Sequence, residues 1–165
     1  MNIVELLLTE FDQEAQTTRK LLALIPEEKF DWAPHEKSTK MKDLAAHIAD
    51  IPRWIKMGLE TEELDFATAP YEPAPIESTA DILEIFEKSY AEGRKSLTQA
   101  KDEHLTGRWV LRTAEQIHAT MTKYEIIRHA FSQVTHHRAQ LGVYLRLLNI
   151  PLPGSYGPTA DDPNF

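Results

Sequence analysis

The sequence has no cysteine, and this one absence removes several classes of chemistry. Without thiols the chain can form no disulfide, supply no thiolate nucleophile of its own and build no metal site on cysteine ligands. The absence is compatible with the reducing cytoplasm, which is where we expect the protein to be located.

Long apolar runs and an excess of basic residues are absent as well. No stretch approaches the roughly 18 apolar residues of a membrane-spanning helix, so we expect no membrane association. The first 14 residues carry acids and lack both a basic leader and a small-residue cleavage site, which argues against a signal peptide. The formal net charge of −8 disfavours general binding to a phosphate backbone, so we expect no nucleic-acid partner.

What is present is a helical pattern in a chain of 165 residues, long enough for one domain over 1–165 and too short for two. The clearest pattern lies between Thr122 and Asn149. Thr122 and Glu125 form a capping box. The inward-facing positions that follow recur at alternating spacings of three and four, which is typical of a helix packed lengthwise on others: Ile127, Ala130, Val134, His137, Leu141, Tyr144 and Leu148.

Similar apolar stripes predict three further helices near residues 2–25, 39–60 and 78–100. Asn2 is the expected cap of the first, Ser38 or Thr39 of the second, and Ser78 with Asp81 of the third.

Pro52 should kink the second helix or break its hydrogen bonding. We interpret 60–77 as a surface loop, 109–111 as a possible short extended piece and 151–165 as an ordered strap on the bundle. No convincing sheet pattern is present. The fold class predicted is all-α, a four-helix bundle with long crossover connections.

Two histidines interrupt the apolar stripes. His137 stands where the last helix requires a Leu or Ile, Gln133 lies one turn before it, and His47 lies on or beside the stripe of the second helix. Inward polar groups must be hydrogen-bonded or bound to a metal. Two imidazoles and an amide oxygen suit a divalent ion such as zinc, nickel, iron or manganese. The alternative is a hydrogen-bonded core cluster, the commoner role of a lone inward histidine.

The remaining polar residues near these positions have weaker patterns. His136 points about 100° away from His137, and His129 is interpreted as a neighbour of the site or an interface residue. Asp43 or Asp50 could orient the His47 imidazole. For Arg138 and Gln140 two interpretations stay open, a polar network with the tail or a solvent-facing position, and for Arg138 we prefer the second. The other histidines are expected to be solvated in loops: His35, His104 and His118.

The run HHRAQL at 136–141, continuing GVYLRLLNIPLPGSYGP into TAD at 159–161, resembles the DinB family. LAAHI at 44–48 resembles it too, and the resemblance covers nearly the whole chain. It implies a four-helix bundle, often a homodimer, with a divalent metal in a cleft between helices. Its typical ligands are three histidines, one in the second helix and two spaced by four in the last.

Carried over to this chain, the first ligand falls on His47, the third on His137 and the second on Gln133, where the family pattern has histidine. An amide oxygen is neutral and a poorer ligand for zinc than imidazole. We therefore expect one of three outcomes: a weakly held metal, use of His129 after rearrangement, or a site that has lost its metal.

The resemblance also suggests an activity, because the wider superfamily includes transferases and isomerases that use small thiols. The first hypothesis is a metal-dependent enzyme, a small-thiol S-transferase or a related hydrolase or isomerase, acting on an electrophilic small molecule. The second is a non-catalytic, stress-associated dimeric bundle in which His47, Gln133 and His137 are structural. A homodimer is expected in both cases, through spare apolar residues such as Trp54, Met57 and Phe66.

Overall fold

Five helices form the body of the computed structural model, which describes residues 2–69 and 75–163. They are α1 (Ile3–Leu22), α2 (Met41–Asp50), α3 (Arg53–Glu60), α4 (Thr79–Gln99) and α5 (Lys123–Leu147). Two short 3₁₀ helices, Glu27–Lys29 and Asp102–Thr106, follow α1 and α4. The strands are β1 (Glu63–Asp65), β2 (Arg108–Thr113) and β3 (Gln116–Thr122). The prediction of a mainly helical bundle is confirmed.

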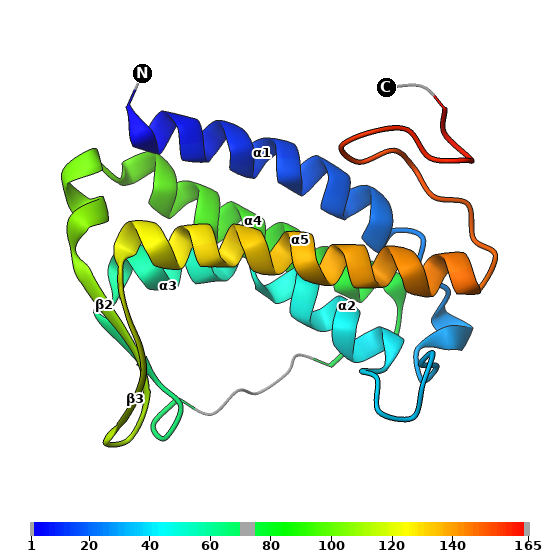
Figure 1. The fold of residues 1–165 in the computed structure, drawn as a ribbon, viewed down its shortest axis with the longest axis horizontal. Helices are drawn as coiled ribbons and strands as arrows, with labels where there is room; N and C mark the ends of the chain where they lie inside the picture. Colours follow the sequence, from blue (N-terminus) through cyan, green and yellow to red (C-terminus); the bar gives the residue numbers. More distant parts are fainter. Residues whose placement is uncertain (1, 70–74, 164–165) are drawn as a thin grey trace.

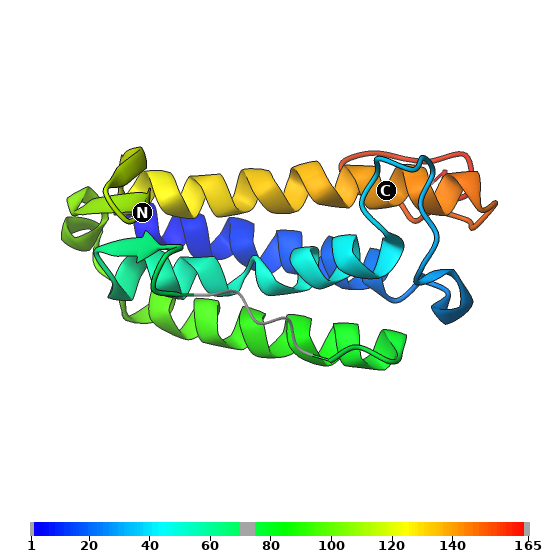
Figure 2. The same cartoon turned by 90° about the horizontal axis from the view of Figure 1, so that it is seen from below.

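The helices pack as four rods, with α2 and α3 together forming one of them (Figure 1). Seen from below, α4 and α5 lie on opposite sides with α1 and the α2–α3 rod between them (Figure 2). Both α1 and the α2–α3 rod contact α4 and α5. The α2–α3 rod therefore shares a long face with α5, and the two predicted site helices are neighbours.

The helix starts follow the sequence closely where a side chain caps them. Asn2, Ser78 and Thr122 each accept a hydrogen bond from the backbone of the third helical residue, and each forms a capping box with the acidic side chain at that position. These boxes satisfy backbone donors that the helix itself leaves free. The predicted starts of α1, α4 and α5 are confirmed, and α1 ends three residues earlier than the predicted 25, at Leu22.

The predicted helix 39–60 is two helices, and the reason is Pro52. Proline has no N–H to donate and crowds the preceding turn, so α2 ends at Asp50 and α3 begins at Arg53. The predicted cap was wrong: α2 begins at Met41, after Lys40, whose side chain makes no capping bond. Gly93 of α4 lies against this junction, where an added Cβ would be 2.4 Å from the Pro52 carbonyl oxygen.

The expectation of no sheet was also wrong, because three short strands pair at one end of the bundle. β1 is parallel to β2, and β2 is antiparallel to β3. The extended piece predicted at 109–111 is part of β2. Trp109 is fully buried, and its indole N–H donates to Thr61 Oγ1 at 3.1 Å. β1 falls within the segment predicted as a surface loop, of which 70–74 lie outside the described residues.

The apolar core fills the bundle in two clusters. One surrounds Leu22, Ile48 and Phe86, and the other surrounds Phe11, Ile55 and Ile127. Both clusters include residues of the α2–α3 rod and of α5, so the helices that carry the histidines are fixed along their length. Within the described ranges, no helix combines the length and apolar character needed to cross a membrane.

Candidate metal centre

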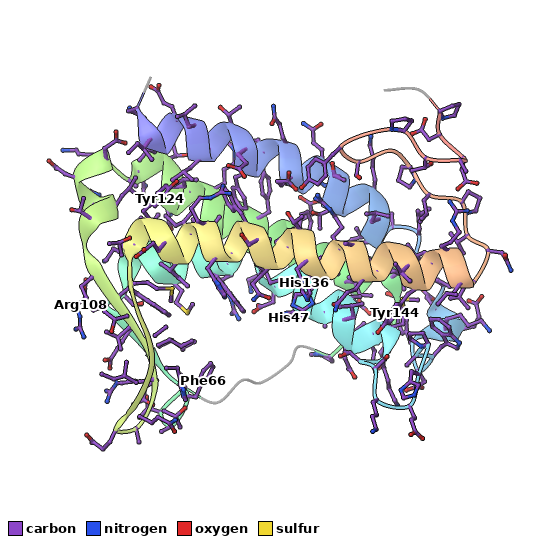
Figure 3. All side chains as sticks on the ribbon, viewed as in Figure 1. His47, Phe66, Arg108, Tyr124, His136 and Tyr144 are labelled. Atoms are coloured by element: carbon purple, nitrogen blue, oxygen red, sulfur yellow. The ribbon has the colours of Figure 1, made fainter. Side chains whose placement is uncertain are left out.

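His47 of α2 and His137 of α5 meet across the face between the two helices. Their ring centroids are 4.5 Å apart and the ring planes are nearly perpendicular, at 83°. Both side chains are half-buried. Figure 3 shows His47 beside the middle of α5, close to the labelled His136. The structure therefore brings together the two histidines that the apolar patterns selected.

Gln133 lies in the same group, one turn before His137 on α5. Its Oε1 is 2.8 Å from His137 Nε2, and its Nε2 is 3.3 Å from His129 Nε2. The second ring nitrogen of His137, Nδ1, is 2.9 Å from Gln140 Oε1. Close polar contacts therefore run along α5 through Gln140, His137, Gln133 and His129.

Trp54 of α3 extends the group on the other side. Its ring meets His47 edge-on at 5.7 Å and is almost parallel to His129 at 6.3 Å between centroids. Trp54 therefore connects the two helices that carry the histidines, since it contacts His47 of α2 and His129 of α5. The sequence pattern did not include Trp54 in the site, since a tryptophan on an amphipathic helix indicates packing as readily as a binding surface.

The position of His47 lowers its pKa below the ordinary value for histidine. Burial contributes most, since it disfavours the charged ring, and the neighbouring His137 adds to the lowering, while Asp50 opposes it. His47 is therefore neutral near pH 7, with a ring nitrogen lone pair available to accept a proton or a metal ion.

This lowered pKa predicts a dependence of folding stability on pH. The unfolded chain binds a proton at His47 more readily than the folded chain does, so stability is retained above the ordinary pKa of about 6.5 and falls as the pH drops through the lower folded value. In chelator-treated protein, urea unfolding at a series of pH values should show this loss. His47→Leu should flatten it, and an identical pH profile in both proteins would contradict the assignment to His47.

The donor set can be compared with what a divalent ion requires. Among residues 2–69 and 75–163, no group of three or more His, Cys, Asp or Glu side chains is placed to hold a metal. The group at hand instead has two imidazoles and one amide oxygen, which suits a divalent ion with open positions. The donor types are therefore compatible with a divalent ion, with fewer strong ligands than a three-histidine site would have.

The inward face of α5 differs from the prediction at Arg138. It is only 3% exposed, while its neighbour His137 is half-buried, so the fully buried position at this level belongs to the arginine. Its guanidinium pairs with Glu14 Oε2 at 2.6 Å and donates to Thr18 Oγ1 at 3.1 Å and to Tyr156 Oη at 2.7 Å. The preferred solvent-facing interpretation was wrong, and the polar network with the tail is confirmed.

The other polar residues divide clearly. His129, His136 and Gln140 are exposed, yet each contacts the site: His136 lies 4.8 Å from His137 between ring centroids. Asp50 forms an ion pair with Arg53 at 2.7 Å. The three histidines expected to be solvated, His35, His104 and His118, are exposed. Two of them do not lie in loops, since His118 is in β3 and His104 is in a 3₁₀ helix.

Comparison with known proteins identifies the family. The DinB family model matches residues 1–164. The chain belongs to the DinB family. The uncharacterized protein YrdA of Bacillus subtilis (strain 168) is 23% identical to it over 156 residues, which are 94% of this chain and 89% of that protein.

Solved structures share the DinB fold. A crystal structure of the DinB-like protein YjoA from Bacillus subtilis matches with a TM-score of 0.73 and 17% identity, over 90% of this chain and 96% of that one. The crystal structure of a mycothiol-dependent maleylpyruvate isomerase matches with a TM-score of 0.62 and 16% identity, over 84% of this chain and 60% of that one. At these identities the likeness shows the fold alone.

Proposed function

We propose that this DinB protein is a metal-dependent enzyme in which His47, His137 and Gln133 hold a divalent ion, zinc, nickel, iron or manganese, and that a small thiol reacts there with an electrophilic small molecule. One observation carries the proposal. The ring centroids of His47 and His137, on different helices, are 4.5 Å apart, and Gln133 Oε1 is 2.8 Å from His137 Nε2. This convergence unites N and O donors on a half-buried face.

The chemistry follows from what each group contributes. A bound divalent ion lowers the pKa of a thiol and favours its thiolate. His47 and His137 are the nitrogen donors, and Gln133 provides a neutral oxygen that leaves the charge of the ion largely uncompensated. Trp54 and His129 supply ring faces beside the donors, against which an apolar electrophile can pack. In the proposed transfer, sulfur bonds to the electrophilic carbon, the displaced electron pair leaves with the departing group, and the thiol proton passes to solvent.

One structural comparison supports a thiol as the co-substrate. The structural neighbour whose name is mycothiol-dependent maleylpyruvate isomerase has the same fold. The present chain has no cysteine, so a thiol used in its reaction would have to come from a small molecule. A transferase is the proposed reaction class, with hydrolase or isomerase chemistry at the same site as its variants.

A second candidate function is favoured by the hydrogen bonds of Gln133. Its amide lies within hydrogen-bond distance of both His137 and His129, so Gln133 has polar partners without a metal. In that case the protein is a non-catalytic bundle.

For either function we propose a homodimer. Trp54 and Met57 are half-buried and Phe66 is 51% exposed, so Phe66 is the residue of the three that most needs covering.

Metal binding by protein purified without a metal-affinity tag separates the two functions. His137→Ala should abolish binding of zinc or manganese in calorimetry. Gln133→His should tighten it by roughly tenfold or more, because imidazole replaces a weak amide donor. His118→Ala is the control, since this exposed histidine lies in β3, contacts Thr113 and Phe66 rather than the site, and should leave binding unchanged. If the parent is empty and Gln133→His does not bind metal either, the group is structural and the enzyme proposal is wrong.

A further inference from the structure

The two ring nitrogens of His137 both face amide oxygens. Nδ1 is 2.9 Å from Gln140 Oε1, and Nε2 is 2.8 Å from Gln133 Oε1. A neutral imidazole carries only one N–H, and an amide oxygen can only accept. One nitrogen can therefore donate its proton to its amide, whereas the other directs a lone pair at an oxygen. That contact becomes favourable when a cation lies between the two atoms or when the amide turns and donates its NH2 to the ring.

The two amides would place that proton differently. If Nε2 carries it, His137 donates to Gln133 and Nε2 has no lone pair beside Gln133 Oε1. If Nδ1 carries it, His137 donates to Gln140 and the lone pair of Nε2 lies next to Gln133 Oε1. Only the second arrangement lets Nε2 and Oε1 act on the same cation. Histidines that bind metals commonly donate their other ring N–H to an oxygen acceptor in this way.

We propose that Gln140 is a positioning residue, which holds the proton of His137 on Nδ1 and so presents Nε2 to the site. Its spacing of three residues places it on the same side of α5 as His137. It is exposed, so its role does not come from core packing. The choice of Nδ1 and the consequence for metal affinity rest on the proposed function, but the position of the proton is measured without metal.

The position of the proton can be measured directly on metal-free protein. In ¹⁵N-labelled protein the nitrogen shifts of a neutral imidazole distinguish Nδ1–H from Nε2–H. The parent should have the proton on Nδ1, Gln140→Leu should move it to Nε2, and Gln140→Glu, which keeps an oxygen acceptor at this place, should return it to Nδ1. The exposed neighbour Ala139, changed to Leu, is the control and should leave the parent pattern. A parent ring with the proton on Nε2, or a Gln140→Leu ring like the parent, would overturn the inference.

A second measurement tests how Gln140 affects the affinity for a metal ion. With zinc or manganese alone in calorimetry, Gln140→Leu should weaken binding by about 10- to 100-fold, the usual effect of losing a partner behind a ligand. Gln140→Glu should bind at least as tightly as the parent. Ala139→Glu adds the same charge one residue away, and it should not reproduce a gain that comes from the bond to Nδ1.

The two measurements separate this inference from the proposed function. If neither the parent nor Gln133→His binds metal while Gln140 still controls the proton of His137, the metal-dependent function is wrong and Gln140 is a positioning residue. If metal binds and neither the proton nor the affinity changes in Gln140→Leu, the function stands and the role of Gln140 is wrong.

Discussion

Replacing Arg138 by methionine is expected to lower the free energy of unfolding by about 3–5 kcal/mol, the range typical when one partner of a buried ion pair is removed. The guanidinium is only 3% exposed and pairs with Glu14, whose side chain is 15% exposed. It also donates to the Glu14 carbonyl oxygen and to Thr18 Oγ1, both at 3.1 Å. Methionine replaces the aliphatic stem but leaves the Glu14 carboxylate without its cation.

The same substitution should loosen the C-terminal tail. Tyr156 receives a hydrogen bond from Arg138 at 2.7 Å and its ring lies under the guanidinium at 5.4 Å, while its hydroxyl contacts the Glu14 carboxylate at 2.8 Å. Without Arg138 the tyrosine loses its contact with α5 through this residue. Limited proteolysis near residue 156 should become faster, alongside a lower midpoint in urea.

Arg146→Met is the matched control for Arg138→Met. Arg146 also lies on α5 and also pairs with an acid of the tail, Asp161, but its side chain is 45% exposed. Exposed pairs of this kind contribute about 1 kcal/mol or less. A second variant, Glu14→Leu with Arg138→Met, removes both charges and should be more stable than Arg138→Met alone. Equal losses in the two single arginine variants would contradict a special role for the buried pair.

Arg138 also shows where sequence reasoning about this fold stops. The stripe on α5 was assigned by residue type, which places the apolar residues correctly but ranks an arginine as a surface residue. Its burial depends on Glu14, 124 residues away, and on Tyr156 in the tail. Both partners are distant from Arg138 in the sequence, so a local pattern does not reveal them. The capped helix starts, in contrast, depend on residues three apart, and they were predicted at Asn2, Ser78 and Thr122.

In the sheet and the site, too, features that depend on nearby residues were predicted and features that depend on distant ones were not. Glu63–Asp65 is short and acidic, and it becomes a strand only because β2, more than 40 residues away, pairs with it. His47 and His137 were found because each interrupts a local apolar pattern, and Gln133 because it lies one turn before His137. His129 was expected only as a neighbour of the site or an interface residue, and Trp54 was assigned to a dimer interface. The contact between them depends on how α3 packs against α5 after the break at Pro52.

Gly93→Ala is expected to destabilise the protein by about 2 kcal/mol, within the range for an overpacked core. On an open helix surface, alanine in place of glycine stabilises by about 0.5–1 kcal/mol. At residue 93 the added Cβ would lie 2.4 Å from the Pro52 carbonyl oxygen and 3.3 Å from Phe11 Cζ. The phenylalanine ring can move, but the oxygen belongs to the backbone of the α2–α3 junction, so one of the helices has to shift.

Gly142→Ala on α5 provides the opposite expectation in the same fold. No heavy atom lies within 4 Å of a Cβ added there, so this variant should gain about 0.5–1 kcal/mol from helix propensity alone. The pair therefore tests the junction rather than glycine in general. A displaced junction should also change the site, because Pro52 lies between His47 and Trp54, whose rings meet at 5.7 Å. Urea midpoints of the two variants, together with the fluorescence of Trp54 in a Trp32→Phe and Trp109→Phe background, measure both effects. If Gly93→Ala is as stable as Gly142→Ala and leaves the fluorescence unchanged, then the close approach of α4 to Pro52 does not set the geometry of the site.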